Sequence, residues 1–172
     1  MKLKDVIIQC SEKVWFNDIP IFWVNNKTWI DTAKDVSDNT SNYKIIKNNY
    51  FAYNPYRINI WSIWLFKWDI WWVSPAYVVF RIDESKVGAD FLLVFLKSRA
   101  GSLEINKHTY WAVRKSLSFK NLWNIEIPDL TIDEQKNLLS KIDEIDKIEK
   151  LLNENLKYTN LLKDRIVNDI IN

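Results

Sequence analysis

The last quarter of the chain carries the most regular hydrophobic pattern of the sequence. Apolar residues recur there at steps of three and four, with charged residues between them and without Gly or Pro, which predicts an amphipathic helix. Thr131 and Glu134 have the spacing of a capping box at its start, just after Pro128. A helix of this length is about 60 Å long at 1.5 Å per residue. Its predicted apolar stripe consists of Leu138, Ile142, Ile145, Ile148, Leu152, Leu156, Leu162, Ile166 and Ile170.

This helix is too long to be covered along its full length by the rest of the chain. We therefore expect its stripe to contact another helix, from a second copy of the chain or from a partner. The alternative is a helix that bends near residues 153–155 and folds back on its own domain. The sequence thus divides into a body over residues 1–130 and a long helix over residues 131–172.

The body alternates short runs of β-branched and aromatic residues with polar turns, which is typical of a mixed, mainly β domain. A polar stretch at residues 31–42 predicts a loop, and Asp90 predicts the start of a short helix over residues 91–98. The fold class predicted is α+β, with short helices in the body and a coiled-coil-type helix at the C-terminal end. The strands are predicted at residues 4–9, 43–46, 50–53, 58–60 and 76–82.

Composition excludes several classes of protein. The chain has 172 residues, 48% of them hydrophobic and 27% charged, with no run long enough for a membrane helix. Its start lacks the apolar stretch of a signal peptide, so we expect a cytoplasmic protein. A single cysteine, Cys10, excludes an internal disulfide, and with a single histidine, His108, it argues against a zinc site. We expect no metal, no cofactor and no catalytic residue, because no nucleophile stands in a suitable motif.

Charge separates the two parts of the chain. Residues 1–130 carry 17 Lys and Arg against 13 Asp and Glu, whereas residues 131–172 carry 7 against 9. The basic residues of the body gather at 57–67 and 97–120, interleaved with Tyr and Asn. Arg and Lys neutralise phosphates, and Arg and Asn also read base edges, so this pattern favours nucleic acid. The candidate DNA-binding residues are Arg57, Asn59, Lys67, Arg99, Lys107, His108, Tyr110, Arg114 and Lys115.

Four motifs resemble the DNA specificity subunit of type I restriction–modification systems. Residues 57–63 are similar to its Arg-Ile-Asn-x-Gly-Ser-Ile, and residues 73–80 match its Val-Ser-Pro-Ala-Tyr-x-Val-Phe closely. Residues 114–118 with 125–128 resemble the end of its target recognition domain. Residues 130–135 resemble the entry into its long helix, and the first six residues fit the usual domain start.

The resemblance implies one target recognition domain and one long helix, where a full specificity subunit has two of each. It implies a non-catalytic protein that binds double-stranded DNA and directs methyltransferase subunits and, through them, a restriction subunit. It also implies that the helix pairs antiparallel with a second copy, so that a homodimer reads a bipartite site whose spacer depends on helix length. Sequence choice is then expected in loops at 31–42 and 99–110, whereas Ser74, Pro75 and Tyr77 hold the fold.

The chain departs from the family in having ten Trp and only two Gly. Gly supplies the positive φ of tight turns, for which Trp is a poor substitute. Our hypothesis is that UGA codons, read as Gly in some bacterial lineages, were translated here as Trp; UGG codons in the gene would refute it. With Trp in place, the turns around residues 61–72 should be strained. The positions concerned are Trp61, Trp64, Trp68, Trp71, Trp72, Trp111 and Trp123.

Two alternatives stay open. Trp rings stack on flat sugar faces, so a Trp-rich carbohydrate-binding module is one of them. Its binding would be insensitive to salt, whereas phosphate contacts make DNA affinity fall steeply with salt. The other is a stand-alone DNA-binding or anti-restriction adaptor, which uses the same domain without a methyltransferase.

Overall fold

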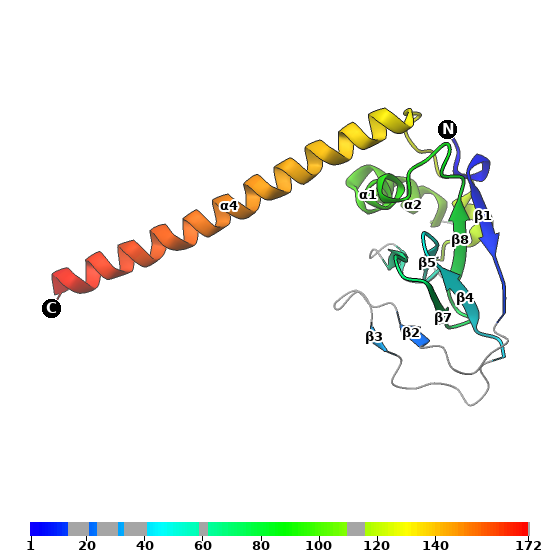
Figure 1. Cartoon of the computed structure of the whole chain (residues 1–172), viewed down its shortest axis with the longest axis horizontal. Helices are drawn as coiled ribbons and strands as arrows, with labels where there is room; N and C mark the ends of the chain where they lie inside the picture. Colours follow the sequence, from blue (N-terminus) through cyan, green and yellow to red (C-terminus); the bar gives the residue numbers. More distant parts are fainter. Residues whose placement is uncertain (14–20, 24–30, 33–40, 59–61, 110–115, 172) are drawn as a thin grey trace. The chain divides into compact units, whose positions relative to one another are not determined.

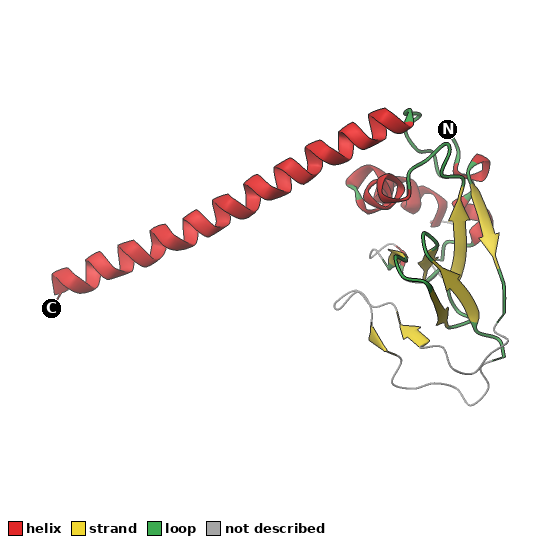
Figure 2. Ribbon diagram, viewed as in Figure 1, coloured by secondary structure: helices red, strands yellow, loops and turns green. Residues whose placement is uncertain are grey.

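The computed structural model describes residues 1–13, 21–23, 31–32, 41–58, 62–109 and 116–171 (Figure 1). The chain divides into two compact units, Met1–Ile132 and Asp133–Asn172. The first contains sheets and short helices, and the second is a single helix (Figure 2). The predicted α+β fold class is confirmed.

The first sheet of unit Met1–Ile132 is antiparallel, with the strand order β1-β8-β5-β6. Its inner strands are the most buried, because all three residues of β5 and three of the five in β8 have almost no exposed surface. The register places Ile7 opposite Ile82 and Phe51 opposite Phe80. The strands are β1 (Ile7–Cys10), β5 (Phe51–Tyr53), β6 (Ile63–Leu65) and β8 (Val78–Ile82).

The second sheet has the order β3-β2-β7-β4 and mixes orientations. Strand β2 runs parallel to β7, whereas β3 and β4 pair antiparallel with their neighbours. Ile45 lies opposite Trp72 and Ile46 opposite Trp71. The strands are β2 (Ile21–Trp23), β3 (Asp31–Thr32), β4 (Lys44–Lys47) and β7 (Ile70–Val73).

Three helices and a 3₁₀ turn complete the unit: η1 (Leu3–Asp5), α1 (Ala89–Lys97), α2 (Arg99–Thr109) and α3 (Phe119–Leu122). Helices α1 and α2 meet at a tight corner, where Ser98 ends α1 and its hydroxyl accepts a hydrogen bond from the Gly101 N–H at 3.1 Å. A Cβ added at Gly101 would lie 2.1 Å from the Phe95 carbonyl oxygen. The backbones therefore approach at a distance that only Gly permits.

The beginning of the chain pairs with the segment that follows α3. Leu3 N–H donates to the Ile125 carbonyl at 3.0 Å, and Ile127 N–H donates to the Met1 carbonyl at 2.9 Å. Ile125 and Ile127 are buried, so this pairing also closes one end of the apolar core. The core itself is aromatic where the first sheet meets α3: the Phe51 and Phe80 rings stack with centroids 4.9 Å apart, and Phe119 follows at 6.1 Å from Phe80.

The second unit is α4 (Ile132–Ile171), 40 residues without interruption. The predicted long helix is confirmed, and Figure 1 shows no bend at residues 153–155. Its apolar side chains are exposed: Leu152 and Leu156 keep 62% and 61% of their surface. In the described part of the chain, no helix is both long and apolar enough to cross a bilayer.

Three local predictions are wrong. Ile58, predicted to begin a strand, lies in a 3₁₀ conformation, and the other two residues of that predicted strand, 59 and 60, lie outside the described residues. The predicted loop at 31–42 begins with a strand, because Asp31–Thr32 pair with β2. The predicted loop at 99–110 is the helix α2 through residue 109, which Ser98 caps and which buries Ile105 and Thr109.

The expected strain around residues 61–72 is also absent where the structure describes them. Among the described residues, only Asn49 combines a side chain with positive φ, at 61°. Trp72 is buried in β7, and Trp64 and Trp71 pack against the core, in conformations that any residue adopts. Trp61 and Trp111 lie outside the described residues. Backbone geometry therefore gives no support for Gly at the described positions, and the UGA hypothesis stays a prediction.

Candidate nucleic-acid interface

Arg57 lies in an exposed turn that follows β5. The Asn54 side chain accepts a hydrogen bond from the Tyr56 N–H at 3.0 Å, and the Asn54 carbonyl accepts one from the Arg57 N–H at 3.0 Å. These bonds are typical of Asn at the first position of a turn, since its short side chain satisfies backbone two residues further on. The turn holds its backbone in place and leaves the Arg57 side chain exposed.

The segment at residue 117 fixes this turn from the other side. Leu117 N–H donates to the Pro55 carbonyl at 2.9 Å, and the buried Tyr53 hydroxyl donates to the Leu117 carbonyl at 3.0 Å. Burial raises the pKa of Tyr53 well above its usual value, so the hydroxyl keeps the proton that it donates. Leu117 comes two residues after Lys115 in the sequence. These two hydrogen bonds hold the segment at residue 117, in the basic stretch 97–120, against the turn that leads into the basic stretch 57–67.

Arg99 is the other exposed arginine among the candidates. It is the first residue of α2, at the corner that Ser98 and Gly101 define. Neither Arg57 nor Arg99 makes a hydrogen bond or ion pair with its guanidinium group to another described residue. Exposed guanidinium groups without a protein partner are available for phosphate or base contacts.

Two candidate lysines are engaged inside the protein. The Lys67 ammonium donates to the Asn49 side chain at 3.3 Å and to Asp90 at 3.1 Å, which ties the turn after β4 to the first turn of α1. Lys107 pairs with Glu104 one turn earlier in α2, and this bond lowers the pKa of Glu104. Both lysines therefore have structural partners that a phosphate would have to replace.

The remaining candidates are less exposed or lie outside the described residues. His108 is half-buried near the end of α2, where its carbonyl accepts a bond from the Asn121 side chain at 3.4 Å. The structure does not describe Asn59, Tyr110, Arg114 and Lys115.

Two further lysines have roles that the sequence did not reveal. The Lys44 ammonium donates to the carbonyls of Pro75 and Tyr77 at 3.0 and 2.6 Å, and so holds the Ser-Pro-Ala-Tyr turn against β4. Lys97 lies over the Trp64 ring, 5.2 Å from its centroid. Burial lowers the pKa of both lysines. No local pattern marks them, because each partner is more than thirty residues away along the chain.

The described tryptophans do not form a flat exposed platform. Of Trp64, Trp68, Trp71, Trp72 and Trp123, only Trp68 and Trp123 are well exposed, at 46% and 41%. Each tilts against a phenylalanine, Phe66 and Phe119 respectively, with ring centroids 5.3 and 5.9 Å apart. In the described part of the chain, the arrangement that a carbohydrate-binding module needs is therefore missing.

Comparison with protein-family models and with curated protein sequences gives no match. Among solved structures, the chain is similar to one from a study of complex assembly and conformational transition of the type I R-M system, with a TM-score of 0.66 and 16% identity. That match covers 94% of this chain and 46% of the other. The chain is also similar to the HsdS subunit from Thermoanaerobacter tengcongensis, with a TM-score of 0.55 and 15% identity over 86% of this chain and 37% of that subunit.

The present chain spans less than half the length of either structure. The match includes nearly all of its residues, so it extends over both units. The resemblance read from the sequence motifs is thereby confirmed at the level of the fold. The protein has the fold of about half of a type I restriction–modification specificity subunit.

Proposed function

We propose that this protein is a non-catalytic specificity half-subunit, which binds double-stranded DNA in a sequence-specific manner and directs type I methyltransferase subunits, and through them a restriction subunit, to a bipartite target. The observation that carries the proposal is the match over 94% of the chain to a structure of the type I R-M system. The basic charge of residues 1–130 and the exposed Arg57 and Arg99 support it.

Self-association is part of this proposal. A protein that recognises two half-sites of DNA needs two recognition domains, and this chain has one such unit, Met1–Ile132. A second copy supplies the other, joined through α4, whose apolar side chains are exposed. A two-fold dimer binds a site with the same symmetry, so the expected target is a palindrome of two half-sites with a fixed spacer.

The direct test is selection from a pool of random 40-base-pair duplexes, with the full chain in the presence and in the absence of a type I methyltransferase subunit. We expect enrichment of one motif with two symmetric halves. Enrichment by the chain without the methyltransferase would favour the stand-alone adaptor instead. A pool that stays random under both conditions would end the proposal.

A matched pair of variants tests the site on the selected duplex. Arg57→Gln removes an exposed cation, and Lys67→Gln removes one that Asp90 already pairs. If Arg57 contacts phosphate, its variant lowers the salt dependence of the logarithm of affinity by about one unit of slope, whereas the Lys67 variant leaves the slope unchanged. Equal slopes for Arg57→Gln and the parent would remove Arg57 from the interface, and binding insensitive to salt would favour a sugar-binding module.

A further inference from the structure

The polar residues within the apolar stripe of α4 determine how two copies of this helix can pair. A line of alternating four- and three-residue steps runs along this stripe and passes beside Ile148 and Leu162. This line, here called the seam, takes residues 138, 142, 145, 149, 152, 156, 159, 163, 166 and 170. Seven of these ten positions are apolar, and the other three are Glu149, Thr159 and Lys163. This is the a/d pattern of a two-stranded coiled coil. The two charged positions stand on opposite sides of residue 154.

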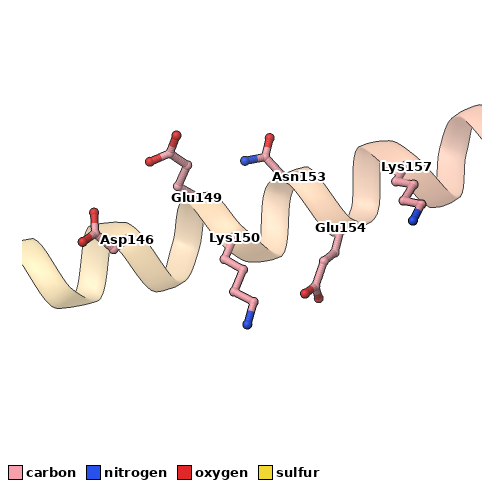
Figure 3. Close-up of a pocket in the computed structure, with 6 residues that line it drawn as sticks. All are labelled: Asp146, Glu149, Lys150, Asn153, Glu154 and Lys157. Atoms are coloured by element: carbon pink, nitrogen blue, oxygen red, sulfur yellow. The ribbon is translucent and has the colours of Figure 1, made fainter. Parts of the chain in front are cut away.

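The close-up of α4 shows to which side of the helix the charged residues near its middle project. Glu149 and Asn153 project to one side of the helix, and Lys150 and Glu154 project to the opposite side (Figure 3). The six labelled residues line a shallow pocket formed by α4 alone, so it is a depression on a single helix. Glu149 therefore belongs to the seam side, whereas Lys150 and Glu154 belong to the outer side.

Parallel, in-register pairing is unfavourable for this seam. In that arrangement each residue faces its own copy, so Glu149 faces Glu149 and Lys163 faces Lys163. The Glu149 pair would lie between two apolar layers, and the Lys163 pair would lie beside the apolar layer of Ile166, where such charges are poorly solvated. These like-charge contacts therefore disfavour a parallel dimer.

An antiparallel pair with its two-fold axis at residue 154 removes this conflict. Leu138 then faces the partner's Ile170, Ile142 faces the partner's Ile166, and Leu152 faces the partner's Leu156. By symmetry these contacts occur twice, which gives six apolar layers of ten. Moving either helix by one heptad leaves only two apolar layers, so the seam specifies one register.

The charged positions are complementary in this register. Glu149 comes one layer from the partner's Lys163, and beside the seam Lys141 faces the partner's Asp169. Ile148, which flanks the seam, faces the partner's Leu162. At the axis Asn153 and Asn155 each face their own copy, and an amide can both donate and accept such a bond.

We infer that α4 pairs antiparallel with a second copy of this chain about an axis at residue 154, and that Glu149 and Lys163 select this orientation. The inference rests on the self-association in the proposed function and adds its register and the residues that determine it.

A charge-swap cycle on the full chain tests the role of the two residues. In the antiparallel pair, Glu149→Lys places two lysines in neighbouring layers, and Lys163→Glu places two glutamates there. Because each contact occurs twice, each single variant should raise the dimer dissociation constant about tenfold, and the double variant should restore it to within about threefold of the parent. Sedimentation equilibrium gives the constants, and Glu154→Lys on the outer side is the matched control, expected to change nothing.

Spin labels test the register itself. Cys10 is buried, and burial raises the pKa of its thiol, so Cys10→Ser removes a poorly reactive group. On that background we label Lys136→Cys or Lys157→Cys and measure the distance between copies by pulsed electron resonance. At 1.5 Å per residue, the labels at 136 should lie about 54 Å apart and those at 157 less than about 25 Å. A parallel pair gives short distances at both positions, and a shift of one heptad changes the long distance by about 10 Å.

The outcomes separate this inference from the proposal beneath it. A parent that stays monomeric at 100 µM overturns both self-association and its register. A dimeric parent with a short distance at position 136, or without recovery in the double variant, overturns the register and the role of Glu149 and Lys163, while self-association stands.

Discussion

The two units of this protein differ in where their apolar side chains lie. In the described part of the chain, every buried apolar residue lies between Leu3 and Ile127. In α4 the apolar residues recur at regular steps of three and four, but Ile145, Leu152 and Ile166 each keep more than half of their surface exposed. The first unit therefore has a core of its own, whereas the stripe of the 40-residue helix is uncovered and is the surface that the proposed second copy would bury.

The largest effect that separates the units is expected from one substitution in each. Phe80→Ala removes a fully buried ring that stacks on Phe51, and should lower the free energy of unfolding by about 3–5 kcal/mol in urea titrations. Leu152→Ala should leave the stability of the first unit within about 0.5 kcal/mol and raise the dimer dissociation constant more than tenfold. A large stability loss in Leu152→Ala at concentrations where the chain is monomeric would contradict the comparison.

A second substitution tests the tight corner between α1 and α2. Gly101→Ala places a Cβ 2.1 Å from the Phe95 carbonyl oxygen, so the helices must separate at a cost of about 1–3 kcal/mol of unfolding free energy. Ala100→Ser, at the exposed neighbouring position, should cost less than about 0.5 kcal/mol. Urea titration compares the unfolding free energies of the two variants. Equal values would show that the corner between α1 and α2 accommodates the added Cβ at little energetic cost.

Tyr53 provides a test that depends on pH. Its buried hydroxyl donates to the Leu117 carbonyl, so Tyr53→Phe should cost about 1–2 kcal/mol at pH 7. Since burial raises its pKa above that of an unfolded tyrosine, near 10, the parent is most stable below that pH and loses stability as the pH rises further. The variant should lose less between pH 9 and 11. The exposed Tyr56→Phe is the control at pH 7, and parallel alkaline profiles for Tyr53→Phe and the parent would refute this role.

The smallest effect is expected at Lys67. Its ion pair with Asp90 is exposed, with 44% and 61% of the two side chains accessible, so Lys67→Met should cost less than about 1 kcal/mol. The difference from the parent should shrink in 1 M salt, where the Debye length is about 3 Å. A cost above about 2 kcal/mol would mean that the contacts of Lys67 with Asn49 and Asp90 stabilise the first unit more than exposed ion pairs usually do.

The sequence was most informative where local pattern decides structure. The helix from Ile132 to Ile171 follows from an unbroken three-and-four periodicity without Gly or Pro. Strand β8 follows from consecutive β-branched and aromatic residues.

Other elements depend on partners distant in the chain. Strands β2, β3 and β7 have only two to four residues each, and pairing with one another defines them. The resemblance placed a loop at 99–110, but these residues form helix α2, in which Gly101 and Ile105 are buried against the rest of the unit.

The candidate site was predicted in part for the same reason. The basic stretches of the sequence made Arg57 and Arg99 candidates, and both are exposed in the structure. The sequence could not reveal that Lys67 would meet Asp90, 23 residues away. Nor could it reveal that Lys44 would bind two carbonyls in the turn between β7 and β8.

The length of α4 has a consequence for how such proteins diversify. In the antiparallel pair, the two copies of Ile132 are separated by 44 residues of helix, about 66 Å. Deleting one heptad before residue 154 would keep the side-chain periodicity and bring these two points about 21 Å closer, which corresponds to roughly six base pairs of duplex. Deleting a single residue would rotate the remaining helix by about 100° and misalign its contacts. Under the proposed pairing, the separation of the two copies of Ile132 can therefore change by whole heptads without loss of the contacts between the helices.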